Sequence, residues 1–85
     1  MADKALEEIK KGEQAKKILD NQVYQEAFTT VKNNIIHAMQ TSPLSDDVTH
    51  NRLVIALQTL NQIEKALTDI MQTGKMAQIQ VNDLK

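Results

Sequence analysis

The sequence of 85 residues predicts an all-α protein built around an antiparallel helical hairpin. Apolar residues between Leu53 and Ile70 recur at alternating steps of three and four, which places them on one side of an α-helix. A second stripe of the same period runs from Val23 to Met39. Residues 41–47, which contain Pro43, separate the two stripes, and a proline cannot continue a helix. Two amphipathic helices joined by a short turn predict the hairpin.

The first twenty residues are rich in lysine and glutamate, and their apolar residues follow the helical period only loosely. Gly12 interrupts them. An isolated helix of this length is marginal in water, and chain ends that pack on nothing fray. We therefore expect a flexible N-terminus over residues 1–12 and a short helix over about residues 13–19.

The two hairpin helices are predicted over about residues 22–40 and 47–73. Asn21 precedes the first of them and is a favourable N-cap residue, as are the aspartates that precede the second. At about 1.5 Å per residue the second helix is roughly 12 Å longer than the first. Its last turns, which carry Leu67, Ile70 and Met71, therefore need another cover, either the short N-terminal helix or a second subunit.

Gly74 is expected to end the second hairpin helix as its C′ residue, so that the hairpin domain covers residues 13–74 and a tail covers residues 75–85. In the tail, Ala77, Ile79 and Val81 alternate with polar residues, which is the period of a β-strand. A lone strand needs a partner chain to satisfy its backbone. We expect an extended or disordered tail, and a frayed continuation of the helix is the alternative.

Composition gives no indication of an enzyme. The chain has no cysteine, two histidines and a net charge of −1, with 10 basic and 11 acidic residues interleaved. No catalytic, metal-binding or cofactor motif is found, so we expect no catalytic residues, no metal and no cofactor. The charge balance does not favour binding to nucleic acid. No apolar run suits a membrane span or a secretory signal, so we expect a cytoplasmic protein.

More apolar surface is present than one short hairpin buries, which favours an oligomer of identical chains. The chain itself is therefore the first expected partner. The candidate interaction residues lie beyond the reach of the first hairpin helix and in the tail: Leu67, Ile70, Met71, Met76, Ile79 and Val81.

Four segments carry a resemblance to a known group of proteins: EQAKKIL (13–19), DNQVYQEAF (20–28), RLVIALQTL (52–60) and TGKMA (73–77). They resemble short helical proteins that tailed bacteriophages encode near their capsid and DNA-packaging genes. The resemblance implies a role in virion assembly or genome packaging through protein–protein contacts. It also implies a capsid or packaging protein as a further partner, and a location in the host cytoplasm or the virion.

The hairpin and the alternating tail also resemble the core of phage small terminase subunits, which form rings. That resemblance implies an alternative function, a DNA-binding ring that presents viral DNA to the packaging motor. The first twenty residues differ from the family because they lack a helix-turn-helix. A second alternative is a small adaptor or inhibitor of a host enzyme.

Overall fold

A computed structural model describes residues 2–84 of the chain. Over this range the protein has three helices and no strand: α1 (Ala2–Asp20), α2 (Gln22–Thr41) and α3 (Asp47–Asp83). The predicted all-α class is confirmed. Met1 and Lys85, the outermost residues of the predicted flexible N-terminus and tail, lie outside the described residues.

Side-chain caps fix where α2 and α3 begin. Asn21 has an extended backbone (φ −69°, ψ 125°), and its side chain accepts a hydrogen bond of 2.9 Å from the N–H of Tyr24. This single residue separates α1 from α2. Asp46 caps α3 by accepting a hydrogen bond of 3.0 Å from the N–H of Thr49. Both helices therefore start where the sequence predicts.

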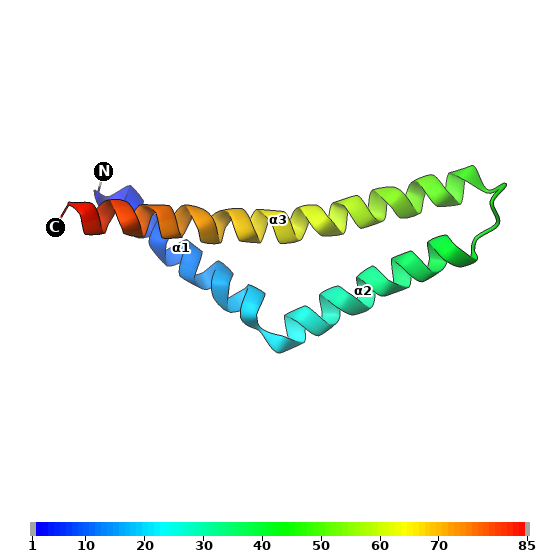
Figure 1. Cartoon of the computed structure of the whole chain (residues 1–85), viewed down its shortest axis with the longest axis horizontal. Helices are drawn as coiled ribbons and strands as arrows, with labels where there is room; N and C mark the ends of the chain where they lie inside the picture. Colours follow the sequence, from blue (N-terminus) through cyan, green and yellow to red (C-terminus); the bar gives the residue numbers. More distant parts are fainter. Residues whose placement is uncertain (1, 85) are drawn as a thin grey trace.

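The two shorter helices follow one another along the long one (Figure 1). By their residue numbers α3 is about 55 Å long, and α1 and α2 are each about 30 Å long. The C-terminal half of α3 packs on α1, which is the most extensive contact in the molecule, and its N-terminal half faces α2. α1 and α2 form a V whose junction lies away from α3.

Two predicted boundaries are wrong. The N-terminal helix covers residues 2–20 and not only 13–19, and the tail is neither extended nor disordered, because α3 continues through Gly74 to Asp83. The reason is that these two segments pack on each other. Within the tail, Ala77 and Val81 continue a helical series with Gly74, and this side of α3 meets α1.

The helices form a thin molecule with almost no enclosed core. It measures 61 × 24 × 15 Å, and two helices lie one over the other along the shortest axis where α1 crosses α3 (Figure 1). Its radius of gyration is 18.1 Å, whereas a compact domain of this length has about 12 Å. Stable domains usually enclose a core between two layers. Here two helices overlap over a short stretch at the α1–α3 crossing, and many apolar side chains elsewhere remain exposed.

Burial is correspondingly sparse. Among the described residues only Gly12, Ala15, Gly74 and Ala77 are buried, and α2 has none. The accessible surface is 6629 Å², whereas about 5,100 Å² is typical of a folded monomer of this mass. The chain therefore exposes roughly 1,500 Å² more than a compact monomer of its size.

Candidate protein-interaction surface

The best-packed point of the molecule is the place where α1 crosses α3, at Gly12 and Gly74. A Cβ atom at Gly74 would lie 2.8 Å from the carbonyl oxygen of Glu8 and 2.9 Å from the Cα of Gly12. A Cβ atom at Gly12 would lie 2.9 Å from the Cα of Gly74 and 3.3 Å from the carbonyl oxygen of Ile70. These partners are backbone atoms, which cannot rotate away. The two helices can approach this closely only because both residues are glycine.

Each helix has an alanine three residues after its glycine. Ala15 and Ala77 are both 3% exposed and extend the contact on either side of the Gly12–Gly74 crossing. Small side chains at this spacing form a flat strip that lets two backbones come together. The sequence between Glu7 and Lys17 therefore makes a well-attached helix, in spite of its many charges.

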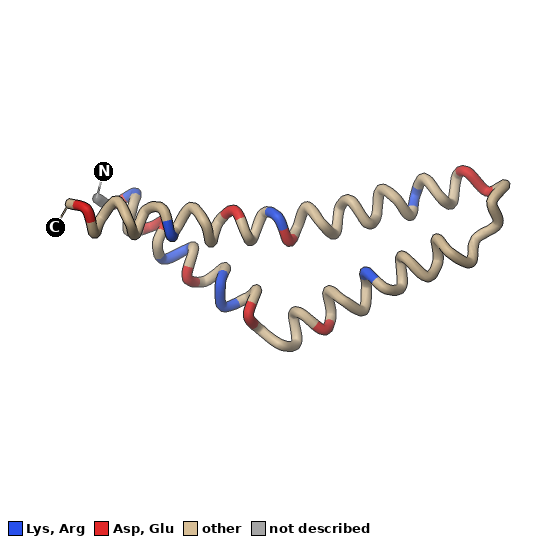
Figure 2. The backbone as a smooth tube through the Cα atoms, in the orientation of Figure 1, with Lys and Arg blue, Asp and Glu red and all other residues tan. Residues whose placement is uncertain are grey.

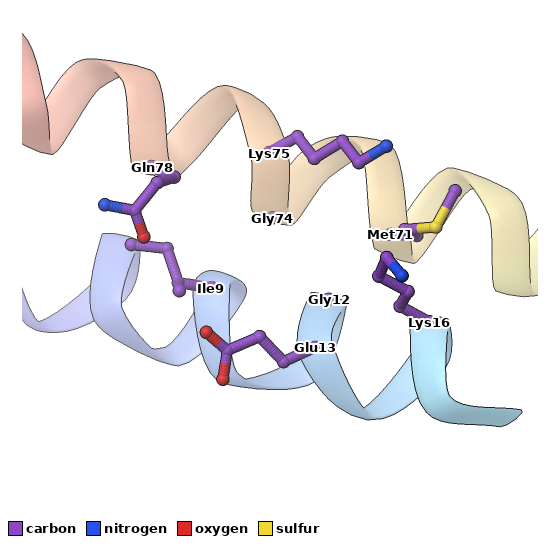
Figure 3. A pocket seen from close by; sticks show the side chains of 8 residues that line it. All are labelled: Ile9, Gly12, Glu13, Lys16, Met71, Gly74, Lys75 and Gln78. Atoms are coloured by element: carbon purple, nitrogen blue, oxygen red, sulfur yellow. The ribbon is translucent and has the colours of Figure 1, made fainter. Parts of the chain in front are cut away.

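A shallow groove of about 190 Å³ lies beside the crossing (Figure 3). The view shows Lys16 of α1 next to Met71 of α3, and Ile9 of α1 next to Gln78 of α3. Small-molecule sites usually have volumes of about 300–1,000 Å³. The groove is smaller than that, and Gly12 and Gly74 form part of its lining.

The predicted interaction residues fall into two groups. Leu67, Met71 and Val81 are half-buried. The carbonyl oxygen of Ile70 lies next to Gly12 at the crossing. These four lie on the side of α3 toward α1. Met76 and Ile79 are largely exposed, and the helical period puts them on the side of α3 away from α1. The six predicted interaction residues therefore do not form one surface: four face α1 and two face away from it.

Many other large apolar side chains are exposed on all three helices and the turn. They are Leu6, Ile18, Val23, Val31, Leu44, Val48, Val54, Ile55, Ile63, Ile70, Met76, Ile79 and Leu84. Charged residues are distributed unevenly over this surface (Figure 2). Only five of the 21 charged residues of the chain lie between residues 21 and 63. The α2 half of the molecule is therefore both apolar and poor in charge.

Ser42 and His50 lie 3.0 Å apart, oxygen to Nε2, at the turn between α2 and α3. This distance is that of a nucleophile and its general base, but the same Nε2 atom lies 3.1 Å from the carbonyl oxygen of Pro43. A carbonyl oxygen only accepts, so Nε2 carries the proton and donates to both partners. It has no free lone pair with which to activate Ser42. The pair closes the turn.

Asp46 holds the same turn through its carboxylate. The hydroxyl of Thr49 donates a hydrogen bond of 2.6 Å to this carboxylate. This bond and the one from the N–H of Thr49 lower the pKa of Asp46 below its ordinary value, and the nearby His50 acts in the same direction. Such a group stabilises the fold above its unfolded pKa, near 4, and the contribution is lost as the pH falls through the lower folded pKa.

We therefore expect Asp46→Asn to lose less stability than the wild type when the pH is lowered from about 5 to 2. The asparagine still accepts the N–H of Thr49 but does not titrate. Urea denaturation followed by circular dichroism at each pH measures the difference. Equal slopes for Asp46→Asn and wild type would contradict the expectation.

Of the two covers predicted for the end of α3, the N-terminal helix is the one present in the structure. The glycines at this contact were not predicted, since Gly12 was expected to interrupt a helix and Gly74 to end one. The available signal was the pattern Gly-x-x-Ala, which occurs twice, as GEQA (12–15) and GKMA (74–77). Val48, exposed on the same side of α3 as Ile55 and Ile63, was not predicted either.

Searches of protein-family models, curated proteins and solved structures find no match for this chain. Within residues 2–84 no helix has the length and apolar character needed to cross a membrane. The described side chains also contain no group of three or more histidine, aspartate or glutamate residues placed to hold a metal ion. What this surface offers is apolar helix sides open to another protein.

Proposed function

We propose that the chain is a non-enzymatic helical protein that acts by binding copies of itself, in the assembly of a tailed-phage particle or in the packaging of its genome. The observation that carries the proposal is the accessible surface of 6629 Å², roughly 1,500 Å² more than a compact monomer of this mass exposes. Apolar helix sides that the chain itself leaves uncovered are stabilised when another subunit covers them.

The phage setting rests on the four segments that resemble short helical proteins of capsid and packaging gene clusters. In this proposal α2 and α3 act as a helical hairpin, and α1 packs on the C-terminal half of α3 and stabilises it. The chain would work in the host cytoplasm or in the virion, with a capsid or packaging protein as its further partner. Its chemistry is limited to apolar packing between helices.

Native mass spectrometry and light scattering test the self-association. At micromolar concentration we expect a mass of two or more times 9.6 kDa. The midpoint of thermal unfolding should also rise with protein concentration, because association stabilises only the folded chain. A strict monomer whose unfolding midpoint does not depend on concentration would overturn the proposal.

Duplex DNA separates this proposal from the small terminase alternative. The near-neutral charge leads us to expect no gel shift at physiological salt. A shift that weakens steeply with ionic strength would favour the DNA-binding ring, since phosphate contacts release counterions.

A further inference from the structure

One side of α3 carries an apolar residue at every second helical turn. Steps of seven or eight residues return to the same side of a helix, so these residues form a single line, which we call the α3 row. The α3 row consists of Val48, Ile55, Ile63, Ile70 and Ala77. Their exposed fractions are 62, 61, 53, 41 and 3%, in that order. The row is thus fully covered at one end and open at the other.

The covered end is the end on which α1 packs. α1 lies over the α3 row at the Gly12–Gly74 crossing, next to Ile70 and Ala77, and it leaves α3 before it reaches Val48. α2 does not take its place, because α2 faces the neighbouring side of α3, where Leu53 and Leu57 are half-buried. The α3 row is therefore covered by α1 at one end, and neither α1 nor α2 covers its open half.

Charge and area indicate what kind of molecule covers this open half. Between Val48 and Ile63 the only charged residue is Arg52, and depletion of charge is typical of the centre of a protein–protein interface. The whole chain exposes roughly 1,500 Å² more than a compact monomer of its mass, and the open half of the α3 row is one part of this excess; a standard interface buries roughly 800 Å² on each partner, so the chain has enough uncovered surface for one. A second copy of this chain supplies the same uncovered, uncharged side of α3.

The position of α1 decides the orientation of the two copies. If the α3 helices ran parallel, the two α1 helices would meet over the same part of the row and would hold the α3 helices apart. If they run antiparallel, the open halves face each other over about 22 Å, the α1 helices lie at opposite ends, and the helix dipoles oppose each other favourably.

We infer that two copies pair through the open half of the α3 row, with antiparallel α3 helices and Ile55 of each copy beside the two-fold axis. The inference rests on the proposed self-association and specifies its first contact. In this arrangement Val48 of one copy packs near Ile63 of the other, because the midpoint of the open half lies at Ile55. Arg52 then faces the region of Thr59, and the two arginines do not meet.

Cysteine cross-linking tests the orientation directly, because the natural chain has no cysteine. Under mild oxidation we expect Ile55→Cys to form a disulfide-linked dimer, because two residues beside a two-fold axis can come within the Cα separation of a disulfide. Ile63→Cys alone should not cross-link, whereas a mixture of Ile63→Cys and Val48→Cys should. Val54→Cys, on another side of α3, is the matched control and should stay monomeric on a denaturing gel.

Charge reversal gives a second readout without oxidation. Ile55→Lys and Ile55→Asp should each lose the dimer in native mass spectrometry, and an equimolar mixture should restore it, because the opposite charges meet at the axis. Val54→Lys should keep the wild-type mass. Since Ile55 is largely exposed within one chain, unchanged helix content by circular dichroism is expected for all these variants.

Each outcome has one meaning. If the wild type is oligomeric but Ile55→Lys keeps its mass, the α3-row contact is wrong while self-association stands. If Ile63→Cys cross-links with itself, the antiparallel arrangement is wrong. If the wild type is a strict monomer, both this inference and the proposed function are overturned.

Discussion

Replacing Gly74 with valine is expected to separate α1 from α3 and to lower the free energy of unfolding by about 3 kcal/mol, at the upper end of the usual cost of overpacking. The Cβ atom alone would lie 2.8 Å from a backbone oxygen of α1, and valine adds two methyl groups beyond it. Helix propensity predicts the opposite sign, since glycine is the less favourable residue inside a helix. The sign of the change therefore distinguishes tertiary contact from propensity.

Chemical denaturation followed by circular dichroism measures this change, and limited trypsin digestion reports where it acts. The lysines of α1, such as Lys10 and Lys16, should become cleavable in Gly74→Val before those of α3. The control is Thr73→Val. Thr73 is the exposed residue next to Gly74, and threonine and valine have similar shapes, so stability should change by less than about 0.5 kcal/mol. An increase in stability for Gly74→Val would show that the helices do not cross at this residue.

Phe28→Ala is expected to loosen the packing of α2 and to cost about 2 kcal/mol, roughly half the loss for a fully buried phenylalanine. α2 has no buried residue, so its attachment depends on half-buried side chains, of which Phe28 is a large one. Phe28 also packs on Tyr24, with ring centroids 6.1 Å apart. Amide hydrogen exchange should speed up throughout α2 while α1 and the C-terminal half of α3 stay protected.

Val23→Ala is the matched control, because Val23 lies on the same helix and is largely exposed. It should leave both stability and exchange close to wild type. Faster exchange in α1 to the same extent as in α2 would contradict the expectation that the effect of Phe28→Ala is confined to α2.

The sequence was sufficient for the helices that begin at strong local signals. Asn21 and Asp46 cap α2 and α3, and Pro43 lies in the turn that separates them. These features act within a few residues of each other along the chain. Their effect does not depend on the rest of the fold, so the caps and the turn can be predicted from the sequence.

The sequence was misleading at both ends of the chain. Gly12 and Gly74 have the lowest helix propensity apart from proline, and residues 77–82 alternate like a strand. Each end alone is a poor helix. Packed on each other, they gain the burial of Ala15 and Ala77 and an approach that no other residue allows at the glycines. Tertiary contact overrides local preference there.

The candidate interaction residues divide in the same way. The sequence placed uncovered apolar surface on the second half of α3, at Leu67, Ile70 and Met71, because α2 is too short to reach it. The structure brings α1 to that stretch and leaves the first half of the α3 row open, at Val48, Ile55 and Ile63. Periodicity shows that a side of a helix is apolar, but it does not show which neighbour covers that side.

The sequence by itself determined that this protein is helical, where α2 and α3 start, and which of its apolar residues share one side of a helix. Only the tertiary structure decided that α1 is a full helix, that α3 continues through Gly74, and that α1 crosses α3 at this glycine. The physical reason is that capping and helical period are local properties. The pairing of two glycines from opposite ends of the chain depends on backbone contact, which only the folded arrangement creates.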